Sequence, residues 1–198
     1  MNAGGMKDNL KIEINYMLRC HVLPVSRRLV YLPWNDQALA ILSIDPVEIF
    51  FAKAVALLNR AAPRDLYDMF NMQKFGFFDK TQEQLFRKCV MFYAAIASES
   101  VPEHFNLTGI DNISAQRIKT DLIPVLRRRE HFDLALVQEQ VKDYLSGILK
   151  PEESELSFWR AFATGEYQPE LLFDDAEIIS RIEHHPMALW KCGRQPAD

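Results

Sequence analysis

Cysteine is scarce in this chain, and long apolar runs are missing. The three cysteines, Cys20, Cys89 and Cys192, are far apart and odd in number, which fits neither a CxxC metal site nor a disulfide framework. No apolar run approaches the roughly 18 residues that cross a bilayer, and the first nine residues hold no hydrophobic signal core. We therefore expect a cytoplasmic protein with no membrane partner.

Several signatures of well-known sites are also absent. The sequence contains no GxGxxG, no GxxxxGK[ST] and no GxSxG, so dinucleotide, P-loop and hydrolase functions lack their residues. The net charge is −4, so any nucleic-acid contact needs a local basic patch. Residues 127–129 are all arginine. A charged helix end is the usual explanation of such a run, and a patch for phosphate groups is the alternative.

The first 45 residues have the pattern of a small sheet. Residues 11–16 alternate polar and apolar side chains, with Ile12 and Ile14 on one face and Glu13 on the other. Further strands are expected at residues 29–32 and 38–43. A sheet this small needs helices packed on one face.

Helix signals dominate the rest of the chain. Asp45 can cap a helix that begins at Pro46 and ends near Arg60, and a second start follows at Pro63. Thr81 and Gln84 fit a capping box. Beyond residues 46–60, the pattern predicts helices at about 64–73, 81–98, 114–128 with a kink at Pro124, 133–149, 151–164 and 175–184. The predicted class is α+β, mostly α, with the sheet in residues 1–45 and a helical domain in 46–198.

The helix over residues 46–60 places a lysine among apolar side chains. Apolar residues cover every side of it, which is typical of a buried helix, and Lys53 lies in its middle. An unpaired buried ammonium costs several kcal/mol. Lys53 therefore either extends along its stem to water or pairs with a carboxylate or a phosphate.

The next helix supplies acidic partners for that lysine. Asp65 and Asp68 are three residues apart and share a helix face, with Arg64 beside them. The helix dipole alone favours an acid such as Asp65 in the first turn. Asp68 lies deeper in the helix and gains less from the dipole, so it is the better partner for Lys53. For Glu13 the alternative to a functional role is simple exposure, since polar residues of an alternating strand usually face solvent.

Together these segments resemble the AbiEii/AbiGii-type nucleotidyltransferase toxin family. The similar motifs occur in family order as KIEI at 11–14, EIFFAKAVALL at 48–58, RDLYD at 64–68, GEYQPELLF at 165–173 and HPMALWK at 185–191. The resemblance covers about residues 9–192.

The resemblance implies a polymerase-β-like nucleotidyltransferase sheet followed by a helical domain. It implies a toxin of a toxin–antitoxin or phage-defence pair that transfers a nucleotide from an NTP with Mg²⁺ to an RNA such as tRNA. By position, Glu13 corresponds to a carboxylate at the metal site, Lys53 to the lysine near the triphosphate and Asp68 to the essential aspartate after it. Arg64 is implied in nucleotide binding, and Asp65 belongs to the same catalytic motif.

One family motif has no counterpart in this sequence. A Gly-Ser turn and an Asp-x-Asp strand should precede residue 11 by many tens of residues, and no Asp-x-Asp occurs in the chain. Glu13 alone cannot hold two metal ions. We therefore expect a fragment, a truncated product or one half of a split enzyme, inactive alone, with a sheet edge that recruits a complementing chain or a second copy. The alternative is a non-catalytic module that binds RNA or protein.

Overall fold

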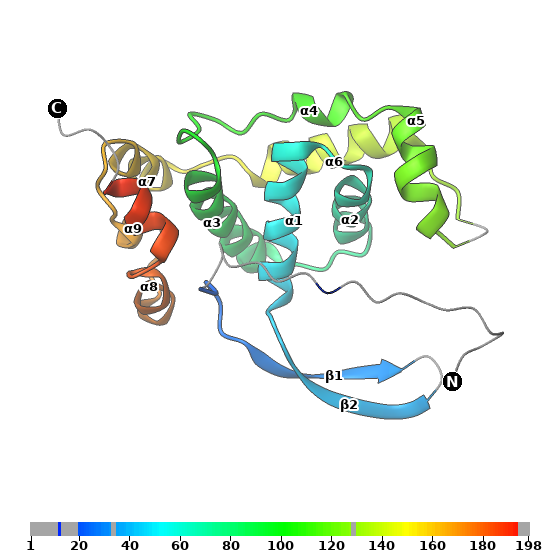
Figure 1. The fold of residues 1–198 in the computed structure, drawn as a ribbon, viewed down its shortest axis with the longest axis horizontal. Helices are drawn as coiled ribbons and strands as arrows, with labels where there is room; N and C mark the ends of the chain where they lie inside the picture. The colour runs from blue at the N-terminus through cyan, green and yellow to red at the C-terminus, as the bar shows by residue number, and fades with distance from the viewer. Residues whose placement is uncertain (1–11, 13–19, 33–34, 128–129, 194–198) are drawn as a thin grey trace.

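A computed structural model describes residue 12 and residues 20–32, 35–127 and 130–193 of the chain. The described part is mostly helical and holds a two-stranded antiparallel sheet, which confirms the α+β, mostly α class. In Figure 1 the two strands extend along one side of the helical body. The division into a nucleotidyltransferase sheet and a helical domain at residue 45 stays a prediction.

The sheet is a hairpin of β1 (Ser26–Leu32) and β2 (Asn35–Ser43). Both predicted strands are confirmed, and each begins earlier than the sequence indicates. Many of its apolar side chains, including Leu29, Tyr31 and Leu42, are exposed, so the described helices do not provide the cover expected for so small a sheet. The predicted strand at 11–16, with Glu13, lies outside the described residues except for Ile12, which is exposed and not in a strand.

Helix α1 (Pro46–Arg60) begins and ends where the sequence predicts. Asp45 caps it, because its Oδ1 accepts the backbone N–H of Val47 at 2.8 Å. The helix packs between α2 (Pro63–Lys74) and α3 (Lys80–Ala97). Ile49 and Ala52 are nevertheless exposed, so the expectation that this apolar helix is buried all round is wrong.

Helix α3 forms much of the core. Its buried residues include Phe86, Cys89 and every residue from Val90 to Ile96. Its N-cap is Asp79, which forms a capping box with Gln82, so the predicted box at Thr81 is wrong. An aspartate carboxylate accepts a stronger, charge-assisted hydrogen bond than a threonine hydroxyl does, and the earlier start lengthens the helix.

The predicted kinked helix at 114–128 is replaced by three short pieces. They are α5 (Ala115–Arg117), a π-helical turn η2 (Ile118–Leu122) and a 3₁₀ turn η3 (Ile123–Val125). Pro124 has no N–H, and its ring conflicts with the carbonyl four residues earlier. The backbone therefore widens before the proline and tightens at it, instead of bending as one helix.

The remaining helices complete the body. Those expected at 133–149, 151–164 and 175–184 are present with shorter ends, and α9, which begins at Pro186, was not predicted. Their bounds are α4 (Thr108–Asp111), α6 (Leu134–Ile148), α7 (Glu153–Ala163), η4 (Pro169–Leu171), α8 (Ala176–Ile182) and α9 (Pro186–Cys192).

A buried glutamate joins the N-terminal part of the chain to the helical body. Glu48 of α1 accepts hydrogen bonds from the backbone N–H of Leu23 through Oε2 and pairs with Nδ1 of His21 through Oε1, each at 2.9 Å. Val22 and Leu23 are buried beside it. This anchor was not predicted from the sequence.

Candidate functional site

Helices α1 and α2 bring the predicted site residues together. Ala61 and Ala62 join the two helices, and Ala61 adopts a left-handed conformation (φ 46°) that ends α1. The chain reverses direction within this short link. The first turns of α2 therefore lie beside the second half of α1.

The ammonium group of Lys53 lies between two aspartates of α2. Its Nζ is 3.1 Å from Oδ2 of Asp68 and 3.8 Å from Oδ1 of Asp65. The structure combines the two alternatives for Lys53, since its ammonium pairs with carboxylates while its side chain is 41% exposed. Asp68 is also the closer partner, as its position deeper in the helix predicts.

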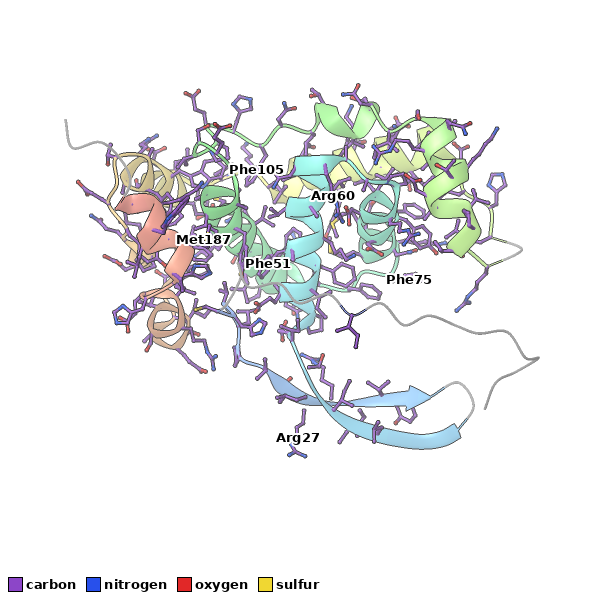
Figure 2. The ribbon with its side chains drawn as sticks, in the orientation of Figure 1. Arg27, Phe51, Arg60, Phe75, Phe105 and Met187 are labelled. Atoms are coloured by element: carbon purple, nitrogen blue, oxygen red, sulfur yellow. The ribbon has the colours of Figure 1, made fainter. Side chains whose placement is uncertain are left out.

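Asp65 is held by a second cation that the sequence did not single out. Arg60, at the end of α1 (Figure 2), donates to Asp65 twice, from Nε to Oδ2 at 2.8 Å and from Nη2 to Oδ1 at 3.1 Å. This hydrogen bonding raises the pKa of Arg60. The helix dipole alone is therefore not a complete explanation of Asp65, which is an ionic link between the two helices.

The cluster divides into a buried part and an open part. The side chain of Asp65 is fully buried, whereas those of Lys53 and Asp68 are 41% and 35% exposed. A ligand in solvent reaches Lys53 and Asp68 directly. It reaches Asp65 only through its effect on Lys53 and Arg60.

The open part lines a pocket of about 320 Å³, which we call the Lys53 pocket. Two further cations line it, Arg64 and Arg127, and its acidic members are Asp68 and Glu130. Arg64 is oriented by the hydrogen bond that its Nε donates to the backbone oxygen of Asp121 at 2.8 Å. The apolar part of the wall consists of Leu122, Val125 and Leu126.

Tyr67 and Glu130 line one side of the Lys53 pocket. The tyrosine hydroxyl donates a hydrogen bond to Oε1 of Glu130, which raises the pKa of Tyr67. Glu130 and Arg127 follow the short turns η2 and η3 in the chain, and sequence reasoning did not place either of them at this site. The only signal was the arginine run at 127–129, of which Arg128 and Arg129 lie outside the described residues.

Residues 2–164 match the protein family described as nucleotidyl transferase AbiEii toxin, type IV toxin–antitoxin system. The chain belongs to this family. The family resemblance is thereby confirmed. The motifs at 165–173 and 185–191 lie beyond the matched residues, so their resemblance stays a prediction. No curated protein matches the chain, and no solved structure does either.

Family membership makes a divalent metal an expected companion of the nucleotide, and the described residues do not fit one. Within the described ranges, no group of three His, Cys, Asp or Glu side chains is placed to hold a metal ion. Asp65 and Asp68 already face Arg60 and Lys53. Glu13, the expected metal ligand, lies outside the described residues.

Two further properties bear on the partners. A family of type IV toxin–antitoxin systems implies an antitoxin as the partner of this toxin. Among the helices that the structure describes, none is long and apolar enough to cross a bilayer.

Proposed function

We propose that the Lys53 pocket binds the triphosphate of an NTP, in a toxin that transfers a nucleotide to an RNA acceptor such as tRNA. The observation that supports this proposal is the placement of Lys53, Arg64 and Arg127 around one solvent-open pocket. Three cations around a hollow are suited to a polyanion, because each forms charge-assisted hydrogen bonds with phosphate oxygens. The family of the chain names the reaction class.

The proposed roles follow from the exposure of each side chain. Lys53 and Arg64 would contact phosphate oxygens and neutralise the charge that develops on the leaving pyrophosphate. Asp68, at the pocket wall, would hold the Lys53 ammonium until the nucleotide arrives. Asp65 would act as a positioning residue, since it is buried and touches Lys53 and Arg60.

The metal-binding part of the reaction would come from elsewhere. Two Mg²⁺ ions on a triphosphate need several carboxylate oxygens. We propose Glu13 as one source and an Asp-x-Asp strand outside residues 1–198 as the other. Residues 11–16, of which only Ile12 is described and is not in a strand, are the proposed place of contact with that strand.

A nucleotide-transfer assay tests this proposal. The purified chain, incubated with Mg²⁺, labelled NTPs and bulk tRNA, is expected to label no RNA. Adding a polypeptide that carries the family's Gly-Ser and Asp-x-Asp segment is expected to produce labelling, which Lys53→Ala and Asp68→Ala abolish. Both variants are expected to change nothing in the assay of the chain alone.

Two outcomes would count against the proposal. Strong labelling by the chain alone that disappears in Asp68→Ala would show that the chain holds a complete site. A well-folded complex with the added polypeptide that labels no RNA would favour a non-catalytic module that binds RNA or protein.

A further inference from the structure

One face of α2 carries a continuous row of polar and aromatic side chains. At a rise of 1.5 Å per residue, the row from residue 64 to residue 75 is about 16 Å long. Its first residues line the Lys53 pocket. Its later part lines a second hollow of about 490 Å³, the Phe75 pocket, whose walls are Tyr67, Asn71, Lys74, Phe75, Arg127 and Glu130.

The two pockets are neighbours along this row. They share Tyr67, Arg127 and Glu130. Tyr67 and Glu130, which share a hydrogen bond, lie where the two pockets meet, and Arg127 lines both. A ligand that occupies the Phe75 pocket can therefore continue past Tyr67 toward Lys53.

Two exposed phenylalanines lie at the end of α2, and one of them, Phe75, lines the Phe75 pocket. Phe75 is 62% exposed and Phe77 is 48% exposed, and their rings stack with centroids 5.8 Å apart. Phe77 also contacts Phe50 of α1 at 5.4 Å. In Figure 2, Phe75 lies at the opposite end of α2 from Arg60.

The turn after α2 holds these rings in place. Gly76 has a φ of +56° between them, the N–H of Phe77 reaches the carbonyl of Met72 at 3.3 Å, and that of Gly76 reaches Gln73 at 3.0 Å. This is a Schellman motif, in which the left-handed position favours glycine. The rings are therefore fixed to the helix end while they remain in solvent.

Positive charge lies directly beside the rings. The ammonium of Lys74 is 5.6 Å from the ring centroids of both Phe70 and Phe75, and Arg127 lines the same hollow. Exposed aromatic faces next to cations are typical of surfaces that bind single-stranded nucleic acid, because bases stack on the rings and phosphates meet the cations. The rings alone would also suit a protein partner. The cations that lie between the rings and the Lys53 pocket favour RNA, because they can contact its phosphates.

We propose that the Phe75 pocket binds the unpaired end of the acceptor RNA. A base stacks on Phe75 and Phe77, Lys74 and Arg127 contact the backbone phosphates, and the terminal nucleotide passes Tyr67 toward the Lys53 pocket. This inference rests on the proposed function, since only a transferase needs an RNA end beside the triphosphate. It adds a site for that end, made by the later half of α2.

RNA binding without any nucleotide tests the inference separately from transfer. A labelled single-stranded RNA decamer and a blunt duplex of the same sequence are titrated with the whole chain, and fluorescence anisotropy is measured. The single strand is expected to bind more tightly, because a blunt duplex hides its base faces. Phe75→Leu should weaken binding of the single strand about tenfold, and Phe75→Trp should keep it. Lys74→Gln should weaken binding. It should also lower the slope of log Kd against log salt concentration by about 0.7, because one phosphate contact is lost.

Matched variants away from the pocket give the control. Tyr31→Leu removes an exposed ring from the hairpin, and Lys150→Gln removes an exposed charge after α6. Neither should change binding. The inference is wrong if Phe75→Leu binds RNA as the unaltered chain does, or if the duplex binds as well as the single strand. It is also wrong if Phe75→Leu changes the molecular mass in solution, which would mark a protein interface. The transfer assay still decides the proposed function in each of these cases.

Discussion

Two clusters of charged residues in this molecule use the same kinds of side chain and differ in their access to solvent. Arg87 of α3 pairs with Glu155 of α7 at 2.8 Å, and their side chains are only 11% and 1% exposed. Lys53 of α1 pairs with Asp68 of α2 at 3.1 Å, and both are more than a third exposed. Both pairs join two helices, but the Arg87 pair lies inside the fold, whereas Lys53 and Asp68 line a pocket.

The difference separates a structural role from a binding role. A buried pair cannot lose one partner without leaving a charge in the protein interior. An open pair is screened by water, contributes little to stability and keeps both charges available to a ligand. The charges that the sequence shows do not distinguish the two clusters. The solvent exposure that the structure shows does.

The largest effect on stability is expected from Arg87. Arg87→Met leaves Glu155 buried without a cation, with only the backbone N–H of Glu152 still bonded to it among the described residues, so the free energy of unfolding should fall by about 3 kcal/mol. Denaturant unfolding measures the change. Lys88→Met is the matched control, because the neighbouring Lys88 forms a surface pair with the exposed Asp174, and it should cost less than about 1 kcal/mol. Equal losses in the two variants would remove the distinction between the clusters.

A smaller loss is expected from Asp65, the buried member of the Lys53 cluster. Asp65→Ala removes the acceptor of two hydrogen bonds, but Arg60 and Lys53 can turn to solvent, so about 2 kcal/mol should be lost. Asp111→Ala, which breaks the exposed pair with Lys142, serves as the comparison in the same unfolding experiment. A loss for Asp65→Ala no larger than that of the control would mean that Asp65 does not tie α1 to α2.

Local signals predicted the helices well, and the contacts between helices were harder to predict. The Asp45 cap and Pro46 fixed the start of α1, and helical spacing alone placed Asp65 and Asp68 on the face that meets Lys53. Arg60 was missed because its link to Asp65 depends on the left-handed turn at Ala61. The local sequence does not predict that turn, because Ala61 is not a glycine or an asparagine.

The far wall of the Lys53 pocket was beyond prediction for a related reason. Glu130 meets Tyr67 across 63 positions of the chain, and Arg127 reaches the pocket because the backbone around Pro124 is not one kinked helix. A periodic pattern predicts which residues share a face, but it does not predict which distant segment covers that face. The exposed stack of Phe75 and Phe77 was likewise not predicted, since the exposure of a side chain depends on which distant segments cover it.

Titration of inorganic triphosphate into the whole chain, followed by calorimetry, tests most directly whether the Lys53 pocket is a triphosphate site. The unaltered chain is expected to bind, and Lys53→Met should weaken binding at least about tenfold, because a charge-assisted contact with phosphate contributes about 1.5 to 3 kcal/mol. Lys150→Met should leave the affinity unchanged. Equal affinity in the Lys53→Met variant, or an equal loss in the Lys150→Met variant, would contradict the account.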